Sequence, residues 1–333
     1  MSELLKAMQN RILILDGAMG TMLQRYKFSE DDFRGERFKG FHKSVKGNND
    51  LLSLTQPQAI EEVHRLYFEA GADIVETNTF SSTTIAMADY DMEDLVYELN
   101  FESAKIAKNV ADAISKKELN KPRFVAGAIG PTNKTASMSP DVNDPGFRAI
   151  SFDELRIAYK QQAEGLIDGG VDILLVETVF DTLNAKAALF AIEEIKEERN
   201  IDVPVMISGT ITDASGRTLS GQTAEAFLIS VSHIPLLSVG FNCALGAKQL
   251  TPHLEVVSKR TQLAISAHPN AGLPNAFGEY DESPEQMASQ VNEYLEKGLI
   301  NIIGGCCGTT PEHIKAIAGI ASGVEPRKFS YNK

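Results

Sequence analysis

Short runs of apolar residues recur along the chain, and most follow a stretch with helical periodicity that ends in glycine. Each run is continuously apolar rather than alternating, which is typical of strands buried on both faces of a parallel sheet. Eight runs fit this description, at residues 12–15, 73–77, 124–129, 172–178, 204–209, 237–243, 263–268 and 300–306. The pattern therefore predicts eight strands that alternate with helices.

The stretches between the runs carry the start and stop signals of helices. Ser151 and Ser283 each have a Glu or Gln three residues later, which is the spacing of a capping box. Thr310 precedes a proline that suits the first turn of a helix. Residues 55–71 also read as a helix, with a glycine at the end.

An internal repeat supports a fold built from strand–helix units. The stretch "AGADIVET" at residues 70–77 resembles "GGVDILLVET" at 169–178, and each places a strand ending in Glu-Thr directly after a helix end. Repeated units of this kind predict an α/β fold of the (β/α)8 TIM barrel type. We expect a single barrel domain over residues 1–325 and a C-terminal tail over 326–333. A doubly wound open sheet is the alternative, and the strand count disfavours it.

Two connections are unusually long for a barrel. Residues 19–54 follow the first predicted strand and residues 130–150 follow the third, whereas such loops usually have two to six residues. Barrel enzymes build their sites from the loops that follow the strands. Both segments are therefore predicted to act as lids or binding surfaces.

Composition narrows the classes of partner. The formal net charge of −13 would repel nucleic acid and anionic lipid, so a small molecule or a protein is the expected partner. The apolar run at 12–15 is too short for a signal peptide, and no stretch approaches the roughly 20 apolar residues of a membrane span. We expect a soluble protein of the cytoplasm, where three cysteines do not form a disulfide framework.

The three cysteines are predicted to meet at one end of the barrel. Cys243 ends the sixth predicted strand, and Cys306 and Cys307 end the eighth between glycines that let the backbone turn. Thiolates suit zinc, and three protein ligands leave a fourth tetrahedral position open to a substrate. The alternative is that the cysteines are small buried apolar residues. Their convergence favours zinc. His268 also ends a predicted strand and can touch the site, but we do not assign it as a ligand.

An open tris-thiolate zinc site indicates a particular chemistry. Three thiolates give the complex a net negative charge, which makes it poor at activating water. The same site can bind a fourth thiol and hold it deprotonated, so that the sulfur stays nucleophilic. The simplest reaction for such a site is transfer of a methyl or other alkyl group to a substrate thiol.

Acidic residues form a second candidate cluster. Asp16, Glu76 and Glu177 each lie at the end of a predicted strand, so their carboxylates can point into the same mouth. Carboxylates in this arrangement suit an ammonium group, while the backbone N–H groups of Gly17 and Ala18 can bind a carboxylate. The alternatives are a turn role for Asp16 and capping or ion-pair roles for the two glutamates.

A set of longer motifs resembles a known family. They are "LDGAMGTMLQ", "DFRGERF", "GNNDLLSLT", "AGADIVETNTF", "VETVFDTLNAKAAL", "GFNCALG", "PNAGLPN" and "GGCCGTTPEHI". Together they resemble the homocysteine S-methyltransferase family over nearly the whole chain, to about residue 325. "RGERF" and "NNDLLSLT" are most similar to the homocysteine-binding module of cobalamin-dependent methionine synthases.

The resemblance implies a zinc-dependent methyltransferase of methionine biosynthesis. It implies zinc bound by Cys243, Cys306 and Cys307, with the sulfur of L-homocysteine as fourth ligand. It also implies that Asp16 and Glu177 hold the amino group of homocysteine. The placement of Glu76 there rests on its predicted strand alone.

The resemblance further implies methylcobalamin as methyl donor, although the chain lacks the Asp-x-His-x-x-Gly signature of a cobalamin ligand. We therefore expect one subunit of a split enzyme or an excised module, with methylcobalamin carried on another polypeptide. The alternatives are direct use of S-methylmethionine or betaine, and a zinc-thiolate protein without catalytic turnover.

Overall fold

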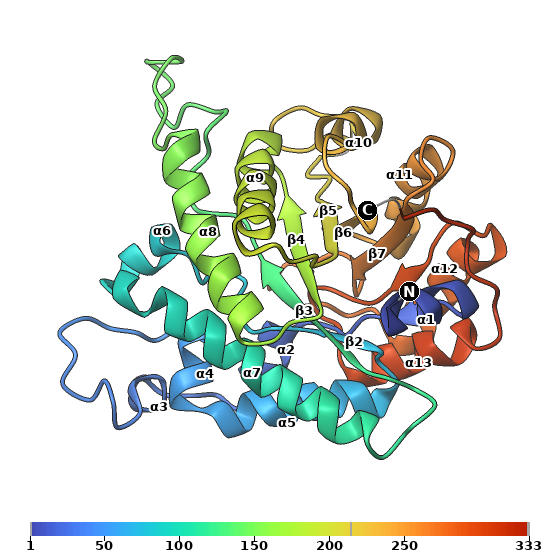
Figure 1. Ribbon diagram of the computed structural model, residues 1–333, viewed down its shortest axis with the longest axis horizontal. Helices are drawn as coiled ribbons and strands as arrows, with labels where there is room; N and C mark the ends of the chain where they lie inside the picture. Colours follow the sequence, from blue (N-terminus) through green and yellow to red (C-terminus); the bar gives the residue numbers. More distant parts are fainter. Residues whose placement is uncertain (1, 214, 332–333) are drawn as a thin grey trace.

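The computed structural model describes residues 2–213 and 215–331. Its eight strands form one parallel sheet in the order β1-β8-β7-β6-β5-β4-β3-β2. A parallel bridge between Leu15 and Ile74 joins β1 to β2 and brings the two outer strands together. The sheet is therefore a nearly closed barrel surrounded by helices (Figure 1), and the predicted TIM barrel is confirmed.

Each of the eight predicted runs overlaps one strand, and β4, β6 and β7 extend one to three residues beyond their runs. The strands are β1 (Leu13–Ile14), β2 (Ile74–Glu76), β3 (Phe124–Ile129), β4 (Ile173–Val179), β5 (Val205–Gly209), β6 (Ser238–Gly246), β7 (Ala264–Asn270) and β8 (Ile302–Ile303). The helices that follow them in turn are α5 (Pro57–Ala70), α7 (Val96–Ser115), α8 (Phe152–Asp168), α9 (Thr182–Arg199), α10 (Ala224–Val231), α11 (Ala247–Ser258), α12 (Pro284–Glu296) and α13 (Pro311–Ala321).

Most of the predicted helix ends are confirmed. Ser151 and Ser283 form capping boxes at the starts of α8 and α12, and Thr310 is the N-cap of α13. The start predicted for the helix over 55–71 is wrong. Gln56 leaves the helical region with φ −134°, so a separate short helix ends before it and α5 begins at the following proline.

The long segment after β1 has structure of its own. It contains α2 (Met19–Gln24), α3 (Glu30–Arg34), η1 (Asn49–Leu51) and α4 (Leu52–Thr55). The shorter helices α6 (Thr84–Met87), η2 (Ala88–Tyr90) and η3 (Glu93–Leu95) lie between β2 and α7. Apolar side chains from both segments, including Phe33, Leu51 and Met87, pack in one buried cluster. This packing fixes the β1 segment beside the mouth of the barrel.

The opposite end of the barrel is closed. Inward-facing side chains such as Leu13 and Met206 fill the interior. Leu4 and Met8 of α1 (Glu3–Asn10) belong to the same buried cluster, and Phe329 packs against it from the C-terminal segment. The helix α1 therefore covers the amino-terminal ends of the strands, and substrate access is left to the carboxyl ends.

The division into a barrel over 1–325 and a tail over 326–333 stays a prediction, and residues 1, 214, 332 and 333 lie outside the described residues. Within the tail, the Arg327 side chain donates hydrogen bonds to the carbonyl oxygens of Ser258 and Leu263. In the described part of the chain, no helix combines the length and apolar character that a membrane crossing requires.

Candidate functional site

The three cysteines come together at the carboxyl ends of the strands, as the sequence predicts. Cys243 lies near the end of β6, and Cys306 and Cys307 directly follow β8. The three sulfurs lie within 4.8 Å of one another, and Sγ of Cys243 is 3.7 Å from Sγ of Cys307. Sulfurs bound tetrahedrally to one ion at about 2.3 Å would be about 3.8 Å apart. The cluster therefore fits a metal ion with three thiolate ligands.

The backbone holds the two adjacent cysteines on one side. The N–H of Cys306 donates to the carbonyl of Pro269 at 2.8 Å, and the N–H of Cys307 donates to Asn270 Oδ1 at 3.1 Å. Gly308 follows with φ +79°, a left-handed conformation that favours glycine. Gly304 has a different role, because a Cβ there would lie 2.8 Å from the carbonyl oxygen of Asp16. One glycine thus allows the turn, and the other allows close approach of β1.

The cysteines have unequal acidity. Hydrogen bonds from Cys243 and Cys306 lower the pKa of the Cys307 thiol to about 3. Hydrogen bonds with its two neighbours, together with burial, raise the pKa of Cys306 well above its usual value. Without a cation the cluster therefore releases one proton easily and resists losing more. A bound cation would stabilise the fully deprotonated form, since metal ligation needs thiolates.

The predicted carboxylates also converge. Asp16 and Glu177 are buried, and Glu76 is only partly exposed. Asp16 Oδ2 accepts a hydrogen bond from the backbone N–H of Glu76 at 3.1 Å. Burial raises the pKa of Glu76 to about 7, and burial together with the charge of Glu76 raises the pKa values of Asp16 and Glu177. Within residues 2–213 and 215–331, no lysine or arginine forms an ion pair with them. This crowding of acids suits a cationic ligand.

The turn after β1 lies beside these carboxylates. Gly17 and Ala18 line the same cavity as Asp16. The N–H of Ala18 donates to Thr309 Oγ1 at 3.1 Å, and Tyr67 donates its hydroxyl to the Ala18 carbonyl at 3.1 Å. The segment after β8 that carries the two cysteines is thereby tied to the turn after β1.

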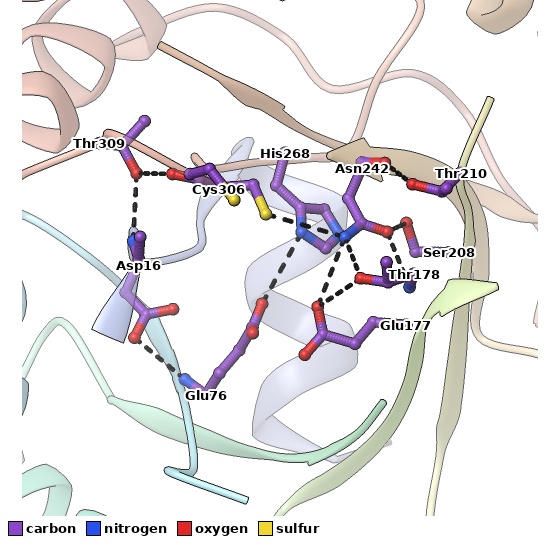
Figure 2. A network of polar contacts seen from close by, with 12 residues as sticks. Asp16, Glu76, Glu177, Thr178, Ser208, Thr210, Asn242, His268, Cys306 and Thr309 are labelled. Carbon is purple, nitrogen blue, oxygen red and sulfur yellow. Dashed lines mark hydrogen bonds and ion pairs between the residues drawn. The ribbon is translucent and has the colours of Figure 1, made fainter. Parts of the chain in front are cut away.

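Asn242 links the sulfur cluster to the carboxylates (Figure 2). Its Oδ1 accepts hydrogen bonds from the backbone N–H of Thr178 at 3.0 Å and from Ser208 Oγ at 2.6 Å. Its Nδ2 donates to Thr178 Oγ1 at 2.8 Å and lies 3.5 Å from Glu177 Oε2 and 4.0 Å from Cys306 Sγ. One buried amide therefore contacts both halves of the site.

The contact with Thr178 supports an uncommon backbone conformation. Thr178 has φ +54°, which is rare for a β-branched residue and costs about 1–3 kcal/mol. The pairing of β4 with β5 shifts register at this point, between Val176 and Val179. Because Thr178 directly follows Glu177, this local reversal lies next to the Glu177 carboxylate, and Thr178 Oγ1 is 3.5 Å from Glu177 Oε2. Asn242 directly precedes Cys243 in "GFNCALG", but the sequence pattern predicts no role for its side chain.

Replacement of Asn242 with alanine is expected to lower the free energy of unfolding by about 2–3 kcal/mol. The substitution leaves the Ser208 hydroxyl and the left-handed Thr178 without their buried partner. Urea unfolding followed by circular dichroism would measure the change. Ser208→Ala is the matched control, because it removes a single donor and is expected to cost about 1 kcal/mol. Equal losses in the two variants would contradict the central position given to Asn242.

The two clusters face one space. A cavity of about 1040 Å³ opens at the carboxyl ends of the strands, and its wall includes the three cysteines and the three carboxylates. Four aromatic side chains also line this cavity, namely Phe80, Tyr90, Phe180 and Tyr280. A ligand in the cavity can therefore reach the sulfurs, the carboxylates and aromatic rings at once.

The loop over residues 130–150 lies at the same end of the barrel and contains no helix or strand. Residues at the start of α9 hold the first part of this loop through hydrogen bonds. Asp181 accepts hydrogen bonds from the N–H of Ser137 at 3.1 Å and from its hydroxyl at 2.6 Å, and Asn184 Oδ1 accepts from the N–H of Ala136 at 2.9 Å. The motif "VETVFDTLNAKAAL" thus contributes both a site carboxylate and the anchors of this loop.

Comparison with known proteins adds a family match. The sequence profile described as homocysteine S-methyltransferase matches residues 13–321. Crystal structures of the homocysteine methyltransferase MmuM from Escherichia coli are similar in fold. The metallated form of MmuM is 23% identical in sequence to this chain, with a TM-score of 0.73. The match covers 95% of this chain and 98% of the MmuM chain. Its oxidized form has 22% identity and a TM-score of 0.70 and covers 92% and 95%.

Proposed function

The chain belongs to the homocysteine S-methyltransferase family, and from that premise we propose a zinc-dependent transfer of a methyl group to the thiol of L-homocysteine, giving methionine. The observation that supports zinc is the convergence of three thiols from β6 and the end of β8 at tetrahedral spacing. When bound there, zinc supplies an open coordination position at which a substrate thiol loses its proton and remains nucleophilic.

The protein side chains would supply the rest of the substrate site. In this proposal Asp16, Glu76 and Glu177 hold the ammonium group, because they are crowded carboxylates without a basic partner. Gly17 and Ala18 would flank the carboxylate of homocysteine from the turn after β1, which lines the same cavity. Because the Ala18 N–H already donates to Thr309 Oγ1, the backbone donor to that carboxylate in this proposal is the N–H of Gly17. Binding both charged groups of the amino acid leaves its thiol directed at the cysteine cluster, and this orientation lowers the entropic cost of reaction.

We further propose that the methyl donor is methylcobalamin carried by another module or subunit. The motifs "RGERF" and "NNDLLSLT" favour this branch of the family. The volume of the cavity, about 1040 Å³, far exceeds what a single amino acid needs and leaves room for a bulky donor at its mouth. In the transfer, the carbon–cobalt bond breaks and a carbon–sulfur bond forms, with the electron pair of the broken bond left on cobalt.

A donor that binds directly is the second candidate. Phe80, Tyr90, Phe180 and Tyr280 line the cavity, and aromatic faces bind sulfonium and quaternary ammonium cations. S-methylmethionine and betaine both carry such a cation. These rings are the specific observation in favour of a direct donor.

A parallel assay of methyl donors is expected to separate the two candidates. Zinc-loaded protein and homocysteine would be incubated with a methylcobalamin-loaded corrinoid protein, free methylcobalamin, S-methylmethionine or betaine, and methionine would be quantified by mass spectrometry. We expect methionine with the loaded protein and a slower reaction with free methylcobalamin. Methionine from S-methylmethionine or betaine, but not from the corrinoid donors, would overturn the assignment of the donor.

A further inference from the structure

One buried histidine in the cavity wall has a ring nitrogen without a hydrogen-bond partner in the described part of the chain. His268 lies in β7, opposite Asn242 of β6, and its side chain is 1% exposed. Its Nε2 is buried without a hydrogen-bond partner among the described residues. Its Nδ1 is 3.8 Å from Glu76 Oε1, which is beyond hydrogen-bond range (Figure 2). A buried polar group left in this way costs about 1–3 kcal/mol, so a ligand is expected to satisfy it.

Polar atoms of three side chains surround a space for a small cation beside His268. One nitrogen of His268 and one oxygen each of Glu76 and Glu177 lie within 4.8 Å of one another. Three acceptors placed tetrahedrally at about 2.9 Å from an ammonium nitrogen would be about 4.7 Å apart. The 3.8 Å between His268 Nδ1 and Glu76 Oε1 lies between this spacing and the about 3.4 Å expected for tetrahedral ligands of a zinc-sized ion at about 2.1 Å. The amino-acid substrate of the proposed function, rather than the spacing, therefore selects an ammonium group.

The charge state of His268 also suits a hydrogen-bond acceptor. Burial lowers the pKa of His268 to about 3, so the ring is neutral at physiological pH and keeps one nitrogen lone pair. Asp16, whose Oδ2 accepts the N–H of Glu76, lies beside this group and adds negative charge to the pocket. The three N–H donors of an ammonium group can thus find two carboxylates and one neutral imidazole.

We propose that His268 is a substrate-contact residue that completes, with Glu76 and Glu177, a three-acceptor pocket for the ammonium group of homocysteine. One ring nitrogen accepts an ammonium N–H, and the other nitrogen carries the ring proton. The inference rests on the proposed function. It assigns to His268 the selection of α-amino thiols over thiols that lack the amino group.

The test compares two thiols that differ only in the ammonium group. L-homocysteine and 4-mercaptobutanoate would be titrated calorimetrically into zinc-loaded wild-type protein and into His268→Leu. We expect the variant to bind homocysteine at least about tenfold more weakly, as befits a lost hydrogen bond to a charged group. Its affinity for 4-mercaptobutanoate should stay within about twofold. His268→Gln, which keeps an acceptor, should recover part of the homocysteine affinity.

His64→Leu is the matched control. His64 is also fully buried, and its ring nitrogens have no hydrogen-bond partner within residues 2–213 and 215–331. It lies in α5 and is not part of the cavity wall. The His64→Leu variant should therefore bind both thiols with the affinity of the wild-type protein. Equal losses for the two thiols in His268→Leu, or no loss for homocysteine, would overturn the role of His268. A second zinc ion per chain that disappears in His268→Leu would overturn it in favour of a metal site. If neither thiol binds the wild-type protein, the proposed function itself fails.

Discussion

Replacement of Cys307 with alanine is expected to remove both the bound metal and the methyltransferase activity. Structural zinc sites with four ligands contribute about 10–16 kcal/mol, so the loss of one thiolate should weaken zinc binding at least about 100-fold. Zinc per chain, measured by mass spectrometry after dialysis, should fall from about one to near zero, and formation of methionine should fall to the blank.

The control for this variant is wild-type protein stripped of metal by a chelator. Both samples should be equally inactive and should keep the circular dichroism of a folded barrel, because the barrel interior is packed from apolar side chains remote from the sulfurs. Zinc should restore the stripped wild type and not Cys307→Ala. Retention of zinc and activity by the variant would contradict the assigned ligand set.

Replacement of Gly240 with alanine is expected to cost at least about 3 kcal/mol of unfolding free energy. Gly240 lies in β6 opposite Ser266 of β7. A Cβ at this position would overlap the backbone carbonyl oxygen of Ser266, which cannot rotate away as a side chain could. The two strands would have to separate, and they carry Cys243 and His268. Soluble yield and the midpoint of urea unfolding would measure the effect.

Gly319→Ala provides the comparison for Gly240→Ala. Gly319 lies within α13, and a Cβ there would meet no atom within 4 Å. Alanine favours helix over glycine by about 1 kcal/mol, so this variant should be as stable as wild type or slightly more stable. Similar behaviour of the two variants would show that the contact between β6 and β7 is not as close as described.

The strands could be predicted because buried parallel strands are continuously apolar, and this pattern needs no tertiary information. Their ends were harder to place. The eighth run was predicted over 300–306, but β8 contains only Ile302–Ile303. The chain leaves the sheet at Gly304, where it packs against the backbone of β1. Likewise, the segment over 19–54 appeared to be a loop because its short helices are stabilised by packing against α7.

The candidate site, like the fold, could be predicted from the sequence only in part. The cysteines and carboxylates could be brought together from sequence, since the carboxyl ends of parallel strands meet at one end of a barrel. The contact between Asn242 and Thr178 could not be predicted from the sequence. It depends on the register shift in β4, where Thr178 has a left-handed backbone. His268 was expected near the site, but its lack of a partner became visible only with its neighbours in place.

The helix α1 has a consequence for the order of events. With one end of the barrel closed by Leu4 and Met8, the cavity opens at the carboxyl ends of the strands, and this mouth is the entrance for ligands. Under the proposed function, a donor protein must cover that entrance to reach the sulfur. Homocysteine would then have to bind first, and methionine could leave only after the donor undocks. Steady-state kinetics should therefore be ordered and sequential, and excess donor should trap the product.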